Sequence, residues 1–413
     1  MLSYNSCPSS CDSLRLEYRR HVFGAGLSHS RLSSGRVGRN RCCCNRQSFV
    51  VIGCYAVTVL LIQNTLIAYH AATRGSTSPA TTSDATQTPT ENSTVQLGSV
   101  VASSSSQSVV VAAMRPAPQP GRLLTENEYY SRRPHKVNEY RHKALLMPRV
   151  LCWQDTLMVI LVHSSPTNLD RREAIRVTWG DAVRHGQWPN DRQSESTLGR
   201  LDVAFVIGLH NNEAVNRAVR QEYARHHDII LGDFIDHYQN MTLKSLLDLK
   251  VVDERCPGVR YLLKTDDDMI INLPYLLDIL GRTSTTRSFM GPYNPRSNVY
   301  RQGVWKLTRA EFPFNFFPPY ESGSAYVITG DLIHELFVTA EYVPHIFIDD
   351  VYVTGILGRV LGVRHIRQSG FAYWGTKTPT ACDLVRRKII TGTKMHPQRL
   401  CALWNDLQLN PKC

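Results

Sequence analysis

The stretch Val259-Arg260-Tyr261-Leu262-Leu263-Lys264-Thr265-Asp266-Asp267-Asp268 decides the fold of this chain. Its apolar first half predicts a buried strand, and three carboxylates that repel one another follow it directly. Ligands of open α/β sheets bind at the carboxyl ends of the strands, and hard divalent cations such as Mg²⁺ or Mn²⁺ bridge carboxylates to the phosphates of a nucleotide. The triplet therefore indicates a metal-assisted nucleotide site, and the alternative is a solvated acidic loop.

Strand and helix patterns alternate before this stretch, which predicts a parallel sheet covered on both faces. Nucleotide binding is then expected at its carboxyl edge. The second half of the chain is less regular. The predicted order is strand 157–163, helix 170–179 ended by Gly180, strand 201–209, helix 213–226, strand 229–231, helix 242–254 and strand 259–264.

The N-terminal third has the composition of a membrane-anchored protein. Residues 49–69 contain no charged side chain and are long enough to cross a bilayer, although a buried core helix is the alternative. Residues 1–48 carry eight arginines against Asp12 and Glu17, which predicts a cytosolic tail and a type II orientation. Residues 70–150 are rich in Ser, Thr and Pro and form the expected disordered stem, whose last part, 121–150, should wrap onto the domain at 151–413.

The charge of the chain does not indicate nucleic acid. About half of the formal net charge of +12 lies in the predicted cytosolic tail. No basic stripe interleaved with aromatic residues follows in the large domain, so nucleic-acid binding is not expected. The sequence leaves open whether the protein forms a homo-oligomer.

Two further groups of residues are candidates for chemistry. Arg172 and Arg176 share one face of the helix at 170–179, where two guanidinium groups suit a diphosphate, and a solvated basic face is the alternative. Asp349 and Asp350 open a predicted helix, where they are either structural caps or, for one of them, a general base. The aromatic and proline-rich run from Trp305 to Tyr320 predicts either a wall on which sugar rings stack or a satellite hydrophobic core.

From 157 to 413 the chain resembles the beta-1,3-glycosyltransferase family, which includes beta-1,3-galactosyltransferases and beta-1,3-N-acetylglucosaminyltransferases. The resemblance lies in five motifs that occur in the family's order and spacing. The motifs are Arg172-Glu173-Ala174-Ile175-Arg176-Val177-Thr178-Trp179-Gly180, Asp233-Phe234-Ile235-Asp236 with Tyr238, Asn240, Thr242 and Lys244, Lys264-Thr265-Asp266-Asp267-Asp268, Phe317-Pro318-Pro319-Tyr320 with Gly323 and Tyr326, and Asp349-Asp350-Val351-Tyr352.

The resemblance implies a GT-A fold, a UDP-sugar donor and inverting transfer of galactose or N-acetylglucosamine to a glycan acceptor on a glycoprotein or glycolipid. It also implies Mn²⁺ (or Mg²⁺) as cofactor and a Golgi membrane location. A catalytically inactive relative, acting as a luminal chaperone or sugar-binding protein, is the alternative. The implied site comprises the base Asp350, the donor contacts Arg172, Arg176, Lys264, Asp266 and Asp267, the metal ligand Asp268, and the acceptor contacts Trp305, Tyr320, Glu321 and Tyr326.

The chain departs from the family pattern at several positions. Glu321 and Ile356 stand at or near positions where the family often has cysteines, and Val304 replaces a common lysine. Thr393 falls where the family often has a metal-ligand histidine, so His396, three residues later, is the candidate second ligand.

The sequence also predicts disulfides and N-glycosylation. Cys152, Cys256, Cys382, Cys401 and Cys413 follow the predicted membrane span, where the lumen is oxidising, but their pairing cannot be assigned from the sequence. Asn92 and Asn240 begin N-glycosylation sequons.

Overall fold

The computed structural model describes residues 124–189, 199–373, 375–409 and 411–413. The predicted tail, the predicted membrane span at 49–69 and the sequon at Asn92 lie outside the described residues. Within those described ranges, no helix combines the length and hydrophobicity needed to cross a bilayer.

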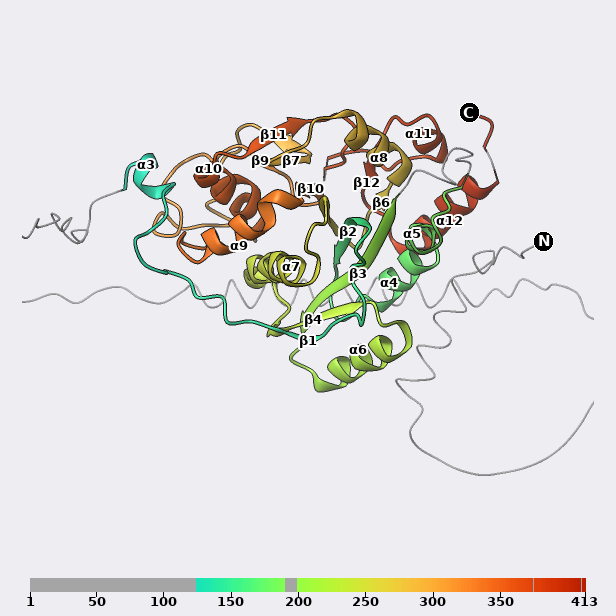
Figure 1. Ribbon diagram of the computed structural model, residues 1–413, viewed down its shortest axis with the longest axis horizontal. Helices are drawn as coiled ribbons and strands as arrows, with labels where there is room; N and C mark the ends of the chain where they lie inside the picture. Colours follow the sequence, from blue (N-terminus) through green and yellow to red (C-terminus); the bar gives the residue numbers. More distant parts are fainter. Residues whose placement is uncertain (1–123, 190–198, 374, 410) are drawn as a thin grey trace, which may run out of the picture. The chain divides into compact units, whose positions relative to one another are not determined.

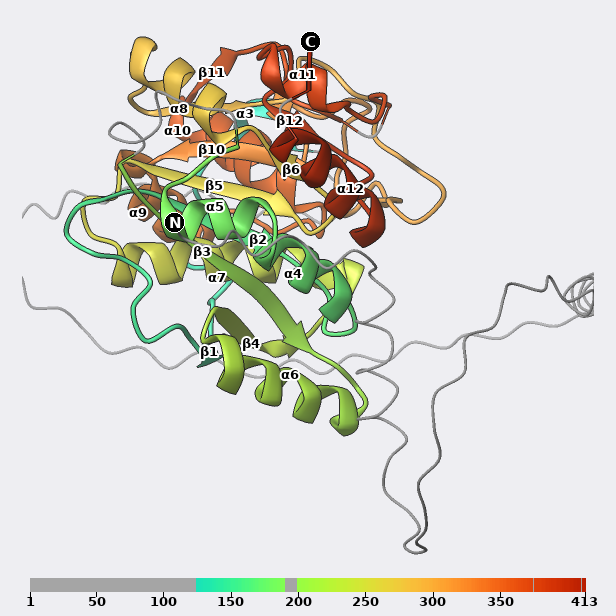
Figure 2. The same ribbon diagram turned by 90° about the vertical axis from the view of Figure 1, so that its right-hand side faces the viewer.

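An eight-stranded sheet forms the centre of the described part of the chain, in the order β1-β4-β3-β2-β5-β10-β7-β11 (Figures 1 and 2). Six of these strands run in one direction, and β1 and β10 run against them. The predicted α/β class with a mostly parallel sheet is therefore confirmed. The strands are β1 (Ala144–Leu146), β2 (Thr156–His163), β3 (Arg200–Leu209), β4 (Ile229–Ile235), β5 (Tyr261–Asp266), β7 (Ser288–Gly291), β10 (Ala325–Thr329) and β11 (Arg364–Arg367).

Two short pairs of strands complete the described sheet structure. β6 (Ile270–Ile271) pairs with β12 (Thr391–Gly392), and β8 (Tyr293–Asn294) pairs with β9 (Tyr320–Glu321). The first pair draws the C-terminal segment alongside the acidic triplet. The described helices are α3 (Glu126–Tyr129), α4 (Leu169–Arg176), α5 (Trp179–His185), α6 (Glu213–His226), η1 (Tyr238–Asn240), α7 (Met241–Arg255), α8 (Leu273–Arg282), η2 (Gly330–Leu332), α9 (Ile333–Ala340), the π-helix η3 (Val351–Leu357), α10 (Gly358–Leu361), α11 (Ala381–Val385) and α12 (Pro397–Gln408).

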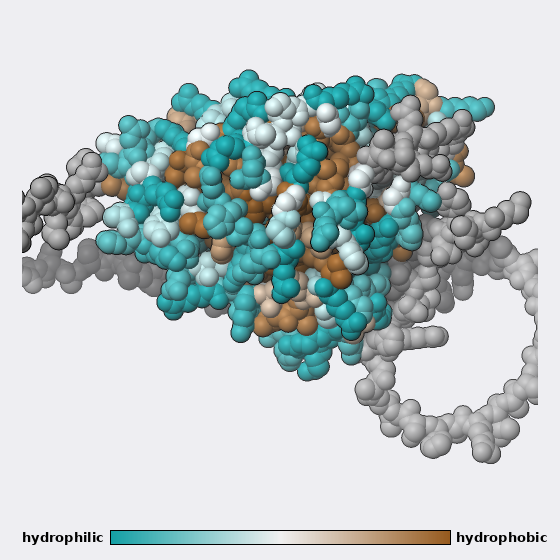
Figure 3. Space-filling view, in the orientation of Figure 1, coloured by the Kyte–Doolittle hydropathy of each residue, from teal (hydrophilic) through white to brown (hydrophobic). Residues whose placement is uncertain are grey.

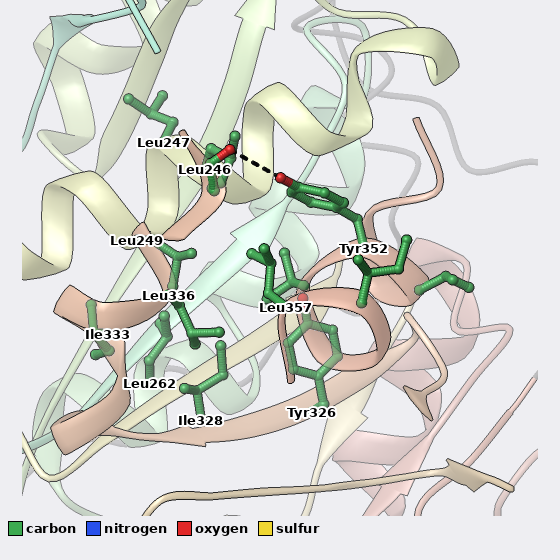
Figure 4. Close-up of a cluster of buried hydrophobic side chains, with 14 of the residues drawn as sticks. Leu246, Leu247, Leu249, Leu262, Tyr326, Ile328, Ile333, Leu336, Tyr352 and Leu357 are labelled. Carbon is green, nitrogen blue, oxygen red and sulfur yellow. Dashed lines mark hydrogen bonds between the residues drawn. The ribbon is translucent and has the colours of Figure 1, made fainter. Parts of the chain in front are cut away.

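Helices cover both faces of the sheet, as Figure 1 shows with α7 and α9 on one side and α4, α5 and α12 on the other. The central strands are accordingly apolar along their whole length, as in β2, because side chains on both faces are buried. Figure 4 shows one of the two cores, in which Leu246 and Leu249 of α7, Leu336 of α9 and Ile328 of β10 belong to the same buried cluster as Tyr352. The Tyr352 hydroxyl is satisfied there because it donates to the Val343 carbonyl at 2.8 Å.

The helix predicted at 170–179 is divided in the structure. α4 ends at Arg176 and α5 begins at Trp179, so the prediction that Gly180 ends a helix is wrong. Gly180 lies inside α5, where a Cβ atom would be 2.6 Å from the Ile175 carbonyl oxygen. The glycine is therefore required by the close approach of the two helices, and the Thr178 hydroxyl, which donates to the Ala174 carbonyl at 2.6 Å, stabilises the break.

The exposed surface is predominantly hydrophilic on the face drawn in Figure 3, with hydrophobic residues showing in patches between polar ones. Residues 124–150 pack onto the folded domain, as expected for this part of the chain, because β1 pairs with β4 and Tyr129 and Tyr140 are buried.

Candidate active site

The site lies at the carboxyl edge of the parallel strands. β2 and β5 are neighbours there, with His163 opposite Asp266, and the acidic triplet continues from β5. The carboxyl end of a strand next to its parallel neighbour is where α/β sheets bind ligands. The sequence therefore places the triplet in the position expected for a nucleotide site.

Lys264 joins the triplet to a loop from the second half of the chain. Its Nζ atom is buried, lies 2.7 Å from Asp266 Oδ1 and donates to the Gly323 carbonyl at 2.7 Å. Burial opposes the charge of Lys264, but Asp266 and Asp349 outweigh it and raise its pKa above the usual value. Lys264 is thus a fixed cation beneath the site, held by protein atoms.

Asp350 reaches the same loop from the other direction. Its Oδ2 accepts a hydrogen bond from the Gly323 N–H at 2.7 Å, and its Oδ1 accepts from the Val351 N–H at 2.7 Å. Gly323 leaves room for this contact, because a Cβ atom there would lie 3.1 Å from Asp350 Oδ2. The backbone of one glycine therefore holds both Lys264 and Asp350, so two acidic motifs that are far apart in sequence share one support.

The carboxylates of this edge are difficult to ionise. Burial, reinforced by the neighbouring Asp349, raises the pKa of Asp350 to about 7. Burial also raises the pKa of Asp266 to about 6, although Lys264 opposes this shift, and it raises the pKa of Asp268 despite the nearby Arg171. A carboxylate with a pKa near neutrality is suited to accept a proton from a hydroxyl group.

Asp268 lies where the C-terminal segment approaches the triplet. Its backbone carbonyl accepts a hydrogen bond from the Met395 N–H at 2.9 Å. His396 is the residue that follows Met395 in the chain. The His396 side chain is exposed and caps α12, accepting from the Arg399 N–H. A histidine that accepts through Nδ1 carries its proton on Nε2, so metal binding by Nε2 requires the other tautomer. Thr393, at the position of the expected histidine, is buried.

The residues at this edge fit a hard divalent cation. Asp268 provides oxygen ligands, and a cation would relieve the burial and the repulsion by Asp267 that raise its pKa. Among the described residues, no three His, Cys, Asp or Glu side chains form a group able to hold an ion by themselves. That arrangement suits an ion that keeps water and phosphate oxygens in its shell, as Mg²⁺ does.

Asp267 is engaged by the protein on both oxygens. Oδ2 accepts from Ser164 Oγ at 2.7 Å and from Asn168 Nδ2 at 2.9 Å, and Oδ1 accepts from Arg171 Nη1 at 2.9 Å. The side chain is buried. Asp267 therefore ties the loop after β2 and the start of α4 to the triplet, which differs from the donor contact expected for it.

The expectation that Arg172 and Arg176 bind a diphosphate is corrected by the structure. Arg172 is 0 % exposed and Arg176 is 3 % exposed. Arg172 makes a bidentate pair with Glu222, with both N···O distances at 2.7 Å, and Arg176 makes one with Asp228 at 2.9 and 2.8 Å. Both guanidinium groups thus satisfy buried carboxylates of α6 and of the turn after it, and their burial leaves neither accessible to a diphosphate.

Of the four residues expected to contact the acceptor, Trp305 is exposed and the other three are buried. Trp305 is 36 % exposed and contacts Tyr238, and Tyr320 is buried with its hydroxyl 3.3 Å from Asn294 Nδ2. Glu321 and Tyr326 are 0 % and 1 % exposed, so direct contact of either with an acceptor is corrected. Glu321 pairs instead with His365 Nδ1 at 3.0 Å behind the site.

A buried polar layer beneath the site was not predicted. His163 Nε2 lies 2.6 Å from Asp248 Oδ2, while Ser245 Oγ donates to Asp349 Oδ2 at 2.8 Å. Burial lowers the pKa of His163 and raises that of Asp248. Asp248 and Ser245 lie on α7 among apolar residues, and a polar residue in such a run was the one signal in the sequence.

Asn240 lies at the turn before α7. Its Nδ2 donates to the Ile235 carbonyl at 2.8 Å, and Thr242 of the same sequon is buried with its hydroxyl on the Ile346 carbonyl at 2.6 Å. These residues therefore have a structural role in the turn, and glycosylation of Asn240 stays a prediction.

Known proteins resemble this chain in sequence over the same region. The family model described as "Galactosyltransferase" matches residues 170–369. Beta-1,3-galactosyltransferase 1 of Mus musculus is 32% identical over 257 residues, covering 60% of this chain and 73% of that protein. Beta-1,3-galactosyltransferase 5 of Homo sapiens is 31% identical over 297 residues, covering 70% of this chain and 92% of that protein.

Solved structures give weaker similarity. The apo structure of the bifunctional glycosyltransferase WbbM has a TM-score of 0.33 at 11% identity and covers 63% of this chain and 50% of that one. The galactosyltransferase LgtC has a TM-score of 0.29 at 12% identity and covers 62% of this chain and 97% of that one. The assignment therefore rests on the sequence relatives and the shared motifs: the chain belongs to the beta-1,3-glycosyltransferase family.

Proposed function

We propose that this protein transfers galactose from UDP-galactose to a hydroxyl group of a glycan acceptor, forming a beta-1,3 linkage on a scaffold of the GT-A type. The observation that carries the proposal is the joint support of Asp266 and Asp350 by Lys264 and Gly323. The names of the relatives, beta-1,3-galactosyltransferases 1 and 5, favour galactose as the donor sugar. N-acetylglucosamine is the second donor to be tested.

The reaction is a single displacement that inverts the anomeric carbon. Asp350 accepts the proton of the acceptor hydroxyl, and the resulting oxygen attacks the anomeric carbon from the face opposite the leaving group. The bond from that carbon to the diphosphate oxygen breaks, and its electron pair leaves with UDP. Both Asp350 oxygens are oriented by backbone N–H groups, so the proton is accepted by a lone pair that remains on a fixed carboxylate.

The triplet positions the donor. The Asp266 side chain is 38 % exposed, and the buried Lys264 fixes one of its oxygens, which leaves the other for hydroxyl groups of the nucleotide ribose or donor sugar. Asp268 would hold Mn²⁺ or Mg²⁺, with His396, the residue after Met395, as the candidate second ligand, and the ion supplies Lewis-acid stabilisation of the leaving diphosphate when bound. Asp267 acts indirectly, because its hydrogen bonds to Ser164 and Arg171 fix the loop between β2 and α4 next to the triplet.

The proposal is tested with the full-length protein in detergent. Release of UDP from UDP-galactose, UDP-N-acetylglucosamine and other UDP-sugars is measured with Mn²⁺ and a panel of glycan acceptors. We expect acceptor-dependent release with UDP-galactose in the wild type and an Asp181→Asn control, and a loss of about 10²-fold or more in Asp350→Asn. Donor binding without turnover on any acceptor would favour the inactive relative.

We also propose that the protein is a single-pass type II protein of the Golgi membrane. The support is the uncharged run at 49–69 and the arginine-rich segment before it. Protease treatment of sealed microsomes should spare the domain at 151–413 and remove the N-terminal tail. Degradation of the domain in sealed vesicles would refute this topology.

A further inference from the structure

A cavity lies against Phe347, three residues before the proposed base, and the proposed mechanism does not use it. Its volume is about 420 Å³, which falls within the range of about 300–1,000 Å³ that small-ligand sites have. Its walls come from three segments: the turn at 237–239, the loop at 303–311 and Phe347. We call it the Tyr238 cavity.

The cavity is on the same edge of the sheet as the acidic triplet. The turn at 237–239 follows the carboxyl end of β4, and β4, β3, β2 and β5 are successive parallel neighbours. The carboxyl ends of parallel strands meet at one edge. A ligand that extends from the triplet along this edge therefore moves toward the cavity.

Phe347 connects the cavity with the proposed base. It lies three residues before Asp350, and the residues on either side of it are fixed to α7. The Thr242 hydroxyl donates to the Ile346 carbonyl at 2.6 Å, and Ser245 Oγ donates to Asp349 at 2.8 Å. Because η1 and its Tyr238 lead directly into α7, the cavity wall and Asp350 are held by the same helix.

The lining has the character of a carbohydrate site. Tyr238 lines the cavity and is 56 % exposed, and Trp305 contacts it edge-on with ring centroids 5.2 Å apart. The indole restricts the movement of the phenol ring, which leaves an exposed aromatic face of fixed orientation. Polar side chains accompany this ring, namely His237, Gln239, Lys306 and Glu311. Aromatic faces with a few polar groups suit a sugar ring, which has both C–H faces and hydroxyl groups.

The charges of the lining favour a neutral ligand. The Glu311 carboxylate is already occupied by the Thr308 N–H and hydroxyl at 2.7 and 2.8 Å. His237 Nδ1 accepts from the Gln239 N–H at 3.2 Å, within its own turn. These two groups are thus engaged by the protein. The Thr308 hydrogen bonds and then the nearby Lys306 ammonium lower the pKa of Glu311, so the two opposite charges of the lining offset each other, and a neutral hydroxyl-bearing residue matches this surface better than an anionic one.

We infer that the Tyr238 cavity binds the second sugar of an oligosaccharide acceptor, counted from the sugar whose hydroxyl is glycosylated. Tyr238 provides the stacking face, Trp305 positions it, and the hydroxyl groups of the sugar bond to the polar lining. This inference rests on the proposed function, because it makes the acceptor an oligosaccharide rather than a single terminal sugar.

The test compares short and long acceptors on the full-length protein. Methyl β-glycosides of galactose and of N-acetylglucosamine are each compared with a trisaccharide that has the same terminal sugar. For the wild type we expect the trisaccharide that serves as acceptor to have a KM lower than that of the matching methyl glycoside by about tenfold or more. A tenfold factor corresponds to about 1.4 kcal/mol of binding free energy. Tyr238→Ala should remove most of this difference and leave the KM for the methyl glycoside nearly unchanged.

Three variants make the result specific to the cavity. Tyr238→Phe retains the stacking face and should behave like the wild type. Val304→Trp adds bulk at a lining residue that is 68 % exposed, and should raise the trisaccharide KM without a loss of stability. Trp153→Ala removes an aromatic ring that is 51 % exposed before the amino end of β2, at the opposite edge, and should change neither KM.

Binding is also measured without turnover, by saturation-transfer NMR of the trisaccharides. If the wild type binds a trisaccharide through Tyr238 and transfers no sugar, the cavity is supported and the proposed function fails. If transfer occurs but the wild type does not distinguish long from short acceptors, the cavity assignment is overturned and the function stands. Equal effects of Tyr238→Ala on both acceptor lengths would also overturn it.

Discussion

Asp350 is held between opposing influences. Two backbone N–H groups favour its carboxylate form, while burial and the adjacent Asp349 raise its pKa to about 7. A general base acts only when it is deprotonated. We therefore expect kcat/KM to rise as the pH is raised through about 7, and to reach a plateau above it. Asp350→Asn should show a low rate without this rise; a wild-type rate that is independent of pH between about 5.5 and 8.5 would contradict the assignment.

The same residue should affect stability in a pH-dependent way. A carboxyl group whose pKa is higher in the folded than in the unfolded protein contributes stability below the unfolded value, near 4, and this contribution is lost as the pH rises through about 7. Asp350→Asn should therefore gain stability relative to the wild type as the pH is raised from about 4 to 8. Melting temperatures at both pH values measure this, with the exposed Asp181→Asn as control. A relative loss at pH 8 would contradict it.

The two arginines of α4 show how far single residues can be interpreted from sequence. The spacing of Arg172 and Arg176 correctly places both on one face of a helix, but a helical repeat does not reveal what covers that face. Glu222 and Asp228, about fifty positions later, cover it. The acidic residues were easier to place, because Asp266 and Asp268 follow a strand whose direction in the sheet was predictable.

Removal of Arg172 should damage the fold rather than donor binding. Arg172→Met leaves Glu222 short of a partner in the core, a change that typically costs about 3–5 kcal/mol. Arg184→Met, which removes an ion pair from an arginine whose side chain is 39% exposed, should cost far less. Denaturant unfolding measures the loss, and calorimetric UDP binding by the folded variant should match the wild type. A selective loss of UDP affinity at full stability would restore the diphosphate role.

Among the elements, the link between β9 and β10 positions the proposed base, because the Gly323 N–H of this link donates to Asp350. Gly323→Ala places a Cβ atom 3.1 Å from Asp350 Oδ2 and must displace the carboxylate. We expect kcat to fall by about tenfold or more, the scale of a misplaced catalytic group, with little change in melting temperature or UDP affinity. Gly281→Ala in α8 is the matched control, because a Cβ atom added at Gly281 would extend into open space. Equal kcat values for both variants would show that Gly323 has no positioning role.

Elements of the first half were more predictable than those of the second. The expected helix at 213–226 coincides with α6, and the expected strand at 201–209 lies within β3. β7, β10 and β11 were not predicted, because strands of four or five residues are too short to show a period. β10 is also buried throughout, so no alternation of polar and apolar residues distinguishes it from a core helix.

At the scale of the whole molecule, two disulfides within the described part of the chain close loops that the sequence could not assign. Cys152 pairs with Cys256 across 104 positions, and Cys382 pairs with Cys413 across 31. Loop-closure entropy predicts a loss of about 3–4 kcal/mol for the Cys382→Ser, Cys413→Ser variant and a larger one, of about 4.7 kcal/mol, for Cys152→Ser, Cys256→Ser. Denaturant unfolding under non-reducing conditions measures both losses. The reverse order of the two losses would contradict the entropic account.

The antiparallel strand β10 between β5 and β7 has a consequence for synthesis on the ribosome. Successive strands β2 to β5 can pair as soon as each emerges, but β7 has no neighbour until β10 and then β11 have been made. During that interval one edge of β5 presents unpaired backbone groups, a template for association with other nascent chains. Chaperones that bind strand edges should therefore engage the growing polypeptide mainly between the emergence of residues 266 and 329.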